Sequence, residues 1–237
     1  MTSLTRDIRV HKALRSEICD VTSVKATNSP PIAYKSGVSY FCEAPFFVNK
    51  NVLIPRFDTE VLVEMVLLHT SVERCSVLDL CTGSGCIAVI LAKHDHKVTA
   101  TDISRRALRV ARKNARLNGV NIEFVKSDMF NKLHGKWFDV IVCNPPYIKN
   151  DEIGKHDETI LHEPRIALDG GEDGLDFYRR IAKDAGNYLK SGGSLYLEIC
   201  HMLGAAVKEL LQKNGFHDIQ ITKDRAGLER VIRCVKS

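Results

Sequence analysis

The sequence lacks the features of a membrane protein, a zinc protein or a disulfide-bonded secreted protein. No apolar run is long enough to span a bilayer, and no hydrophobic signal segment opens the chain. The eight cysteines form no CxxC pair, so the closely spaced ligands of a zinc site are missing and we predict no metal site. Most cysteines lie in apolar runs, which favours buried thiols in a reducing compartment; we assign structural roles to Cys143, Cys200 and His201.

An excess of charge of one sign is also missing. The 34 Lys and Arg residues and 29 Asp and Glu residues leave a net charge of +5, and the two signs are interleaved along the chain. This pattern argues against a basic nucleic-acid-binding surface. What remains is ordinary globular composition, 44% hydrophobic and 27% charged, over 237 residues, which suits one α/β domain with a small appendage.

Strand-like and helix-like segments alternate from residue 59 to 216, and two further strands follow. Such alternation predicts a doubly wound, mostly parallel sheet of seven strands with an antiparallel terminal hairpin. We expect a helix over 175–189, a turn over 191–193, and Asp58 or Thr59 as the cap of a helix that follows residue 59. The predicted organisation is a short helix and linker over 1–31, a β-hairpin segment over 32–55, and the main catalytic domain over 56–237.

Three successive strand ends carry groups that suit an adenosine. The first strand leads into Gly83-Ser84-Gly85, where glycine lets the backbone approach a ligand and the next helix supplies free N–H groups. The second strand ends in Asp102, nineteen residues after Gly83, near the spacing of a ribose-binding carboxylate. The third is followed by Asp128 and Met129, an acceptor for an adenine amino group and an apolar cover for the ring.

Two cofactors fit these strand ends. The turn matches the dinucleotide pattern G-x-G-x-x-A, whereas Asp79 beside it would favour the positive sulfonium of S-adenosyl-L-methionine over a pyrophosphate. A tight turn with no ligand is the third reading. We favour S-adenosyl-L-methionine.

The fourth strand, 138–143, runs into Asn144-Pro145-Pro146-Tyr147. The prolines end strand pairing, and the carboxyl end of such a strand is where ligands bind in an open α/β sheet. The Asn144 side-chain oxygen and the Pro145 carbonyl can each accept one N–H of a planar NH2 group, and the Tyr147 ring can stack on it. Two acceptors favour the pyramidal nitrogen that attacks an activated methyl group. The alternative is a loop that only ends the strand.

Five segments of the chain match one family pattern: 52–60, 78–85, 144–148, 163–175 and 223–227. Together they resemble the protein-glutamine N5-methyltransferases, which modify the Gly-Gly-Gln loop of peptide-chain release factors. The resemblance implies a Rossmann-like class I fold, S-adenosyl-L-methionine as cofactor, and methyl transfer to a glutamine amide nitrogen in translation termination. Two departures are Cys81, where the family has its first turn glycine, and Phe57-Asp58, where it has Pro-Glu. Residues 1–31 precede the resemblance, so we expect an N-terminally short member.

These arguments define the candidate site. We expect catalysis by Asn144, Pro145 and Tyr147, and substrate binding by Asn144 to Tyr147 with Arg56. We expect a release factor as partner, no membrane or nucleic-acid binding, a monomer, and a location in the cytoplasm or an organelle. The runner-up is an N-methyltransferase of adenine or guanine amino groups in DNA or RNA, which shares the tetrapeptide. A dehydrogenase and a non-catalytic adenosine-binding scaffold are the more distant alternatives. The expected cofactor contacts are Asp79, Cys81, Thr82, Gly83, Ser84, Gly85, Asp102, Ile103, Asp128, Met129 and Asn144.

Overall fold

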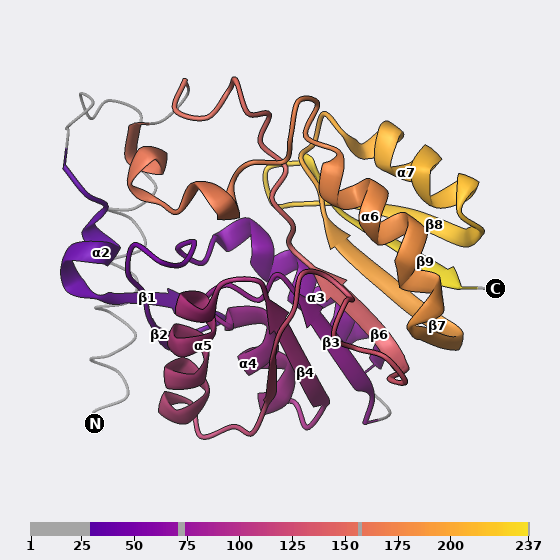
Figure 1. Ribbon diagram of the computed structural model, residues 1–237, viewed down its shortest axis with the longest axis horizontal. Helices are drawn as coiled ribbons and strands as arrows, with labels where there is room; N and C mark the ends of the chain where they lie inside the picture. Colours follow the sequence, from indigo (N-terminus) through magenta and orange to yellow (C-terminus); the bar gives the residue numbers. More distant parts are fainter. Residues whose placement is uncertain (1–28, 71–73, 156–157, 237) are drawn as a thin grey trace, which may run out of the picture.

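A seven-stranded sheet organises the part of the chain that the computed structural model describes, residues 29–70, 74–155 and 158–236. The predicted helix over the first residues lies outside these ranges. Figure 1 shows the sheet with helices on both of its faces. The strands are β3 (Ser76–Leu80), β4 (Lys97–Asp102), β5 (Glu123–Lys126), β6 (Phe138–Cys143), β7 (Leu189–Glu198), β8 (Phe216–Lys223) and β9 (Glu229–Lys236).

The strand order is β5-β4-β3-β6-β7-β9-β8. Strands β3 to β7 run parallel, whereas β9 lies antiparallel to both β7 and β8. This confirms the predicted fold class. The chain leaves β3 towards β4 on one side and returns to β6 on the other, so a crevice opens at the carboxyl ends of β3 and β6, where ligands bind in such sheets.

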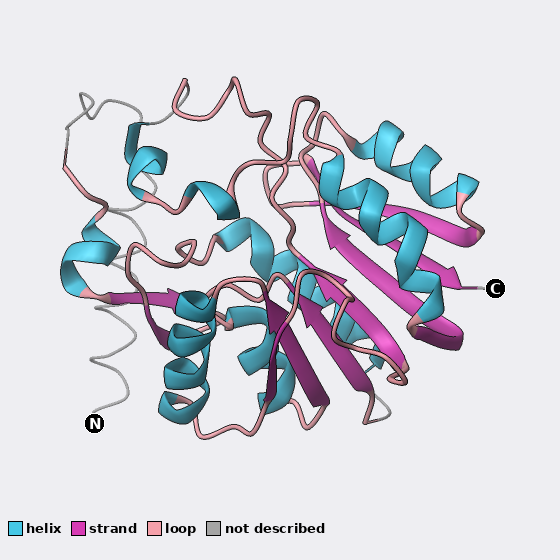
Figure 2. Ribbon diagram, viewed as in Figure 1, coloured by secondary structure: helices cyan, strands magenta, loops and turns pink. Residues whose placement is uncertain are grey.

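Helices cover the two faces of the sheet in separate groups, as Figure 2 shows. Alternate side chains of each buried strand point to opposite faces, so Val140 and Val142 join one core and Ile141 and Cys143 the other. The first core contains residues of α3 (Phe57–Thr70) and α4 (Cys86–Lys93), with α5 (Arg105–Leu117) packed beside α4; the second contains residues of α6 (Asp176–Asp184) and α7 (Gly204–Lys213).

A small hairpin precedes the main sheet and packs against it. Phe41 and Phe46 are buried in the first core, with ring centroids 6.1 Å apart in an edge-to-face arrangement. The Asn114 side chain accepts from the Phe47 N–H at 2.7 Å and donates to its carbonyl at 3.0 Å, which ties the hairpin to α5. The hairpin confirms that part of the predicted fold; the division of the chain into segments at 31 and 55 stays a prediction. The elements are α2 (Ile32–Ser36), which the sequence did not predict, β1 (Val38–Phe41) and β2 (Ala44–Phe47).

Three local predictions are wrong. The predicted turn over 191–193 lies inside β7 as a bulge, because Leu189 pairs with Phe138 while Ser194 already pairs with Val140. The predicted helix 175–189 ends at residue 184 and a 3-10 turn, η3 (Ala185–Asn187), follows it. Helix α3 begins at Phe57, so Asp58 and Thr59 lie within its first turn instead of capping it.

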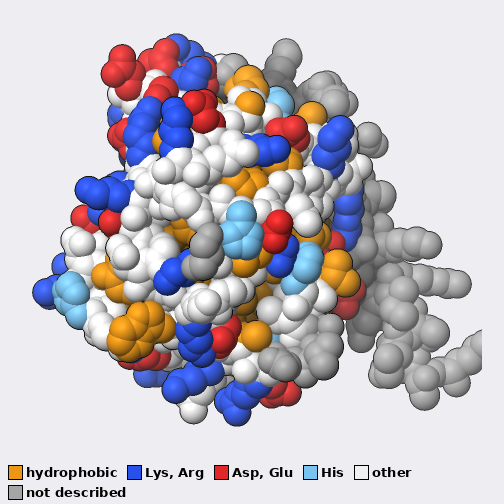
Figure 3. Space-filling model, turned by 90° about the vertical axis from the view of Figure 1, so that its right-hand side faces the viewer, with side chains coloured by type: hydrophobic (Ala, Val, Ile, Leu, Met, Phe, Trp, Pro, Cys, Tyr) orange, Lys and Arg blue, Asp and Glu red, His pale blue; other side chains and the backbone are white. Residues whose placement is uncertain are grey.

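Four further features are a helix cap, the state of the cysteines, the character of the helices and the charges on the surface. The Ser104 side chain accepts from the Ala107 N–H at 3.1 Å and so caps α5. No disulfide joins cysteines within the described ranges. Among the described helices, none has the length and apolar character needed to cross a membrane. Figure 3 shows positive and negative side chains interspersed on one face of the molecule.

Candidate active site

One cavity lies at the carboxyl ends of β3, β4, β5 and β6. It brings together eight of the predicted site residues, Cys81, Gly83, Asp102, Ile103, Asp128, Met129, Asn144 and Pro146. Two segments that the sequence did not assign to the site cover it. They are residues 51–53, and residues Pro164, Ile166 and Ala167, which lie in and before the 3-10 helix η2 (Arg165–Ala167).

Asp102 joins the glycine-rich turn to the start of α5. One carboxylate oxygen accepts from the Gly83 N–H at 2.9 Å and the other from the Ser104 N–H at 2.7 Å. Burial raises the pKa of Asp102, and the two N–H bonds oppose that rise by stabilising the charged form. Each carboxylate oxygen can still accept a second proton, so this residue of the cavity wall can take the two hydroxyls of a ribose.

Asp79 lies beneath the turn, outside the cavity wall. It is fully buried, and one of its oxygens accepts from the Thr82 hydroxyl at 2.6 Å while Oδ1 has no partner in the described structure. Burial raises the pKa of Asp79 to about 7. An unpaired buried acceptor behind the turn is compatible with a cationic ligand in front of it, and would disfavour a pyrophosphate.

The other predicted turn residues shape the turn from behind. Thr82 and Ser84 are buried and do not line the cavity. A Cβ at Gly85 would lie 2.9 Å from the Ala111 Cβ, so glycine is required there for close packing of the turn on α5.

Cys81 and Met129 lie in the cavity wall with left-handed backbones, at φ 57° and 46°. Side chains rarely adopt this conformation, whereas glycine would adopt it without strain. The two sulfur atoms lie 3.8 Å apart and form an apolar surface at the ends of β3 and β5. This surface suits the face of a purine ring.

Asp128 does not stand as a free acceptor. One of its oxygens accepts from the Arg180 guanidinium at 2.6 Å, in an ion pair in which both side chains are about two-fifths exposed. Arg180 extends from α6 to the cavity, beside Phe177 of the same helix. The second oxygen of Asp128 keeps its capacity to accept, so the predicted adenine contact is reduced to that atom.

Asn144 is held by a residue 85 positions earlier. Its amide nitrogen donates to the Thr59 hydroxyl at 3.1 Å, which leaves the side-chain oxygen available as an acceptor. Thr59 is buried in the first turn of α3, where its side chain serves the site. The Asn144 amide is therefore oriented as the sequence argument requires, with its oxygen free to accept a hydrogen bond.

Tyr147 points its hydroxyl away from the cavity. The hydroxyl donates to Glu198 Oε1 at 3.1 Å, and burial raises the pKa of Tyr147 well above its usual value. Pro145 is buried beside Pro146, and neither Pro145 nor Tyr147 lines the cavity. Tyr147 therefore anchors the loop instead of offering its hydroxyl to a ligand.

A second segment supports the loop after residue 147 through backbone contacts. The Ile148 N–H donates to the Leu168 carbonyl at 2.9 Å, and the Gly170 N–H donates to the Ile148 carbonyl at 2.8 Å. A Cβ at Gly170 would lie 2.7 Å from the Tyr147 Cα, and one at Gly174 only 2.5 Å from the Tyr147 carbonyl oxygen. Gly170 and Gly174 are therefore needed for this close approach.

Arg56 joins the two segments that cover the cavity. It forms an ion pair with Glu163, whose other carboxylate oxygen accepts from the Ile54 N–H at 3.0 Å. Glu163 is only 6% exposed, whereas the Arg56 side chain is 38% exposed, so the carboxylate is the buried half of this junction. Residues Ile54-Pro55-Arg56 and Glu163-Pro164-Arg165 are thus one structural unit, although Arg56 itself does not line the cavity.

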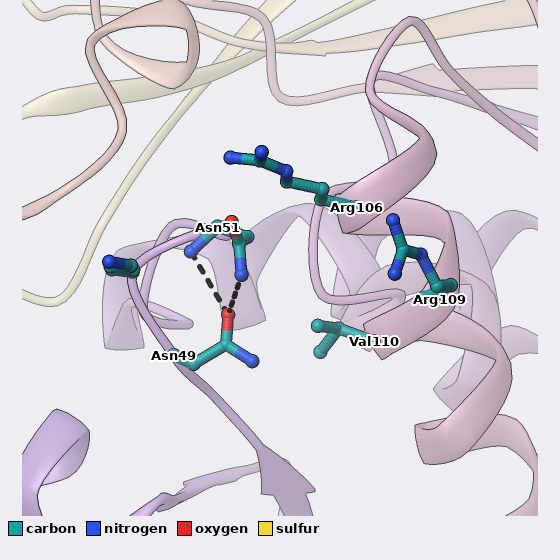
Figure 4. Close-up of a pocket in the computed structure, with 6 residues that line it drawn as sticks. Asn49, Asn51, Arg106, Arg109 and Val110 are labelled. Carbon is teal, nitrogen blue, oxygen red and sulfur yellow. Dashed lines mark hydrogen bonds between the residues drawn. The ribbon is translucent and has the colours of Figure 1, made fainter.

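A second, basic cleft lies beside the cavity and shares Asn51 with it. Figure 4 shows two arginines of α5 facing the loop 49–51 across this cleft. The Asn51 backbone and side-chain nitrogens donate to Asn49 Oδ1 at 3.0 and 2.8 Å, which shapes the loop. The lining residues are Asn49, Lys50, Asn51, Arg106, Arg109 and Val110.

The sequence argument missed Thr59, Glu198 and Arg180. Glu198 did carry a signal, because it is a carboxylate at the end of the apolar run Leu195-Tyr196-Leu197. Thr59 was explained by a capping role, and Arg180 shows no pattern that distinguishes it from other exposed helix arginines.

Fold and site together define a class I methyltransferase with a nucleoside cofactor site. Residues 56–172 match the family model described as "Methyltransferase small domain". A release factor glutamine methyltransferase of Thermodesulfovibrio yellowstonii is 42% identical over 87% of this chain and 77% of its own length. One from Neisseria gonorrhoeae is 43% identical over 90% and 79%.

A solved structure shows the same relationship. The release-factor-specific protein-(glutamine-N5) methyltransferase of Alicyclobacillus acidocaldarius is 29% identical, with a TM-score of 0.50 over 81% of this chain and 99% of that one. The chain belongs to the release factor glutamine methyltransferase family.

Proposed function

We propose that this protein transfers a methyl group from S-adenosyl-L-methionine to the side-chain amide nitrogen of the glutamine in the Gly-Gly-Gln motif of a release factor. The observation that carries the proposal is the Asn144 amide, whose nitrogen is committed to Thr59 and whose oxygen is left for a substrate N–H. The family relationship supports the choice of a glutamine amide over a nucleic-acid base.

The cavity residues fit this cofactor. Asp102 would hold the ribose diol, Asp128 Oδ2 the adenine amino group, and the Cys81 and Met129 sulfur surface the purine face. When bound, the cofactor supplies a methyl group activated by the positive sulfonium. The Asp79 carboxylate beneath the turn, whose Oδ1 has no partner in the described structure, favours that positive charge.

The acceptor loop would hold the glutamine NH2 group between Asn144 Oδ1 and the Pro145 carbonyl. Because Pro146 has no N–H, the loop cannot close into regular strand pairing at this point. These two acceptors draw electron density towards the amide nitrogen and favour its pyramidal form. They therefore stabilise the transition state more than the planar ground state. Holding the two reactants together supplies much of the remaining acceleration. The nitrogen can lose its proton to water after transfer.

The test is transfer of a labelled methyl group from S-adenosyl-L-methionine to release factor, with the motif glutamine replaced by alanine as control. Label in the intact release factor alone is the expected result. Label in DNA or RNA and none in release factor would overturn the proposal in favour of a base amino-methyltransferase. The monomeric state and the cytoplasmic or organellar location remain predictions of the sequence.

A further inference from the structure

The basic cleft beside the cavity has no role in the mechanism above. Its volume is about 410 Å³, and its three cations are Lys50, Arg106 and Arg109. Figure 4 shows the two arginine side chains extending from α5 towards the loop 49–51. All three residues are exposed, and none of their charged groups has a hydrogen-bond or ion-pair partner within the described ranges. The cleft therefore offers three positive side chains to a ligand.

Helix α5 concentrates positive charge at a cost to its own stability. It carries six Lys and Arg residues and no acidic residue. Arg105, Arg109 and Lys113 follow one another at intervals of four residues, the spacing at which like charges repel on a helix. By contrast, cations of the other described helices pair with acids, as Lys213 does with Glu209 on α7. The charge of α5 is therefore better explained by an anionic partner than by helix stability.

The cleft is continuous with the cofactor cavity. Asn51 lines both hollows, and Ala107, between two cleft residues of α5, lines the cavity. The same cavity extends to Asn144 and Pro146 of the acceptor loop. A ligand in the cleft therefore lies next to whatever occupies the methyl-transfer site.

The polar groups of the cleft suit a peptide that carries carboxylates. Asn49 Oδ1 accepts both bonds from Asn51, so the Asn49 amide nitrogen is left as a donor and the Asn51 side-chain oxygen as an acceptor. A peptide backbone needs both kinds of partner, whereas a phosphate backbone only accepts. The planar guanidinium of arginine matches a carboxylate with two parallel hydrogen bonds.

We propose that this cleft docks an acidic segment of the release factor, next to the loop whose glutamine enters the cavity. This inference rests on the proposed function. Two other occupants have the wrong charge. Residues 1–28 carry five Lys and Arg against three Asp and Glu, and a second copy of the chain has a net charge of +5. An acidic protein segment supplies both the negative charge and the backbone donors and acceptors that the cleft matches.

The first test reverses the charge of the cleft. In Arg106→Glu/Arg109→Glu we expect KM for release factor to rise at least about tenfold. The kcat at saturating release factor should stay within about twofold of wild type, and the cofactor Kd, measured by calorimetry, within about threefold. Arg106→Gln/Arg109→Gln removes the charge without reversing it, so its KM should lie between those of wild type and the reversed variant.

Arg116→Glu is the matched control. Arg116 is exposed on α5, seven residues after Arg109 and so on the same face of the helix, but it does not line the cleft. We expect its KM for release factor to equal that of wild type. An equal rise of KM in Arg116→Glu and in the double reversal would mean that only the overall charge of α5 matters, and would overturn the inference.

A charge swap tests the partner itself. Release factor whose acidic residues beside the glutamine loop are replaced by lysine should have a higher KM with the wild-type enzyme. The same release factor should have a lower KM with Arg106→Glu/Arg109→Glu than unmodified release factor has. Wild-type KM should also rise with ionic strength, whereas that of the double reversal should not.

Several outcomes would overturn the inference. One is a KM of the double reversal within about twofold of wild type. With such an unchanged KM, lost binding of an RNA oligonucleotide would assign the cleft to nucleic acid, and a lost dimer in sedimentation would assign it to a second copy. If the double reversal does not fold, the glutamine variant decides. A wild type that does not label release factor would instead overturn the proposed function.

Discussion

The two sides of the cavity are built by opposite means. On the cofactor side, Asp102 bonds Gly83 and Ser104, which lie 19 and 2 positions away along the chain. On the acceptor side, Asn144 depends on Thr59 at a separation of 85, and Tyr147 depends on Glu198 at a separation of 51.

This difference determines what each side can tolerate. The cofactor side is a strand–turn–helix unit that organises its own carboxylate with backbone N–H groups. The acceptor side is held by side chains from α3 and β7 and by the backbone of segment 168–174, so its geometry depends on the whole fold. Substitutions should therefore affect cofactor affinity on the first side and turnover on the second.

The largest expected effect separates the two sides directly. Asn144→Ala removes the oxygen acceptor of the substrate amide, so kcat should fall about 100- to 1,000-fold. Cofactor Kd, measured by calorimetry, should change less than about threefold, because the cofactor side is built locally. Asn214→Ala, at the exposed end of α7, is the control. Near-normal turnover in Asn144→Ala would contradict the role of Asn144 as the acceptor of the substrate amide.

Asp102→Ala should show the reverse pattern. Loss of the ribose acceptor is expected to raise the cofactor Kd about 10- to 100-fold, from a charged hydrogen-bond pair of roughly 1.5–3 kcal/mol. At saturating cofactor, kcat should recover most of its value. Asp102→Asn keeps one acceptor oxygen, so its cofactor Kd should lie between those of wild type and Asp102→Ala. An unchanged Kd in Asp102→Ala would remove the ribose assignment.

Gly170→Ala tests the support behind the acceptor loop. The new Cβ would meet the Tyr147 Cα at 2.7 Å, so the loop must move and kcat should fall about tenfold with cofactor affinity retained. Gly186→Ala is a matched control, since a Cβ there meets nothing within 4 Å. Equal effects of the two substitutions on kcat would mean that close packing at residue 170 does not position the loop.

Asp79 predicts a pH dependence of stability. Its pKa of about 7 lies above the ordinary value of 3.8, so its contribution to stability is complete below pH 4 and is lost as the pH rises to 7. The free energy of unfolding of wild type should fall relative to Asp79→Asn over this range, by on the order of 1–4 kcal/mol. Denaturant unfolding at pH 4.5 and pH 8 measures it. A constant difference between the two proteins would contradict the assignment.

The smallest effect concerns the turn itself. Cys81→Gly relieves a left-handed backbone at φ 57° and should stabilise the protein by about 1 kcal/mol. Cys81→Ala keeps the backbone strain and loses the contact with Met129, so it should be neutral or destabilising. Thermal unfolding of both variants measures the difference. A lower melting temperature for Cys81→Gly than for Cys81→Ala would mean that the side chain stabilises the turn.

The same contrast explains what the sequence could predict. Asp102 and Asn144 follow buried strands directly, and strand ends in a parallel sheet meet at one edge, so their proximity follows from the strand pattern alone. Thr59 reaches Asn144 from α3 across 85 positions, and a buried polar residue at such a separation leaves no periodic signal. Glu198 left only the signal of a carboxylate at the end of an apolar run. The bulge in β7 looked like a turn, because Gly192-Gly193 is typical of both.

The sequence also could not predict which charged side chains form ion pairs at the site. Asp128 lies in the cavity wall just after β5, but its partner Arg180 comes from a helix 52 positions later. A helix arginine can face solvent or a neighbouring carboxylate, and only the packing of α6 on the sheet decides which.

The Glu163 junction ties together the two segments that cover the cavity, so they should move as one unit when the cavity opens. Its carboxylate bonds the Ile54 N–H and Arg56 together, so the segments cannot separate without leaving a buried charge unpaired. Hydrogen exchange at the Ile54 amide should therefore report how often the junction between segments 51–56 and 163–167 opens. A single amide thus gives the frequency with which the cavity exposes its contents to water.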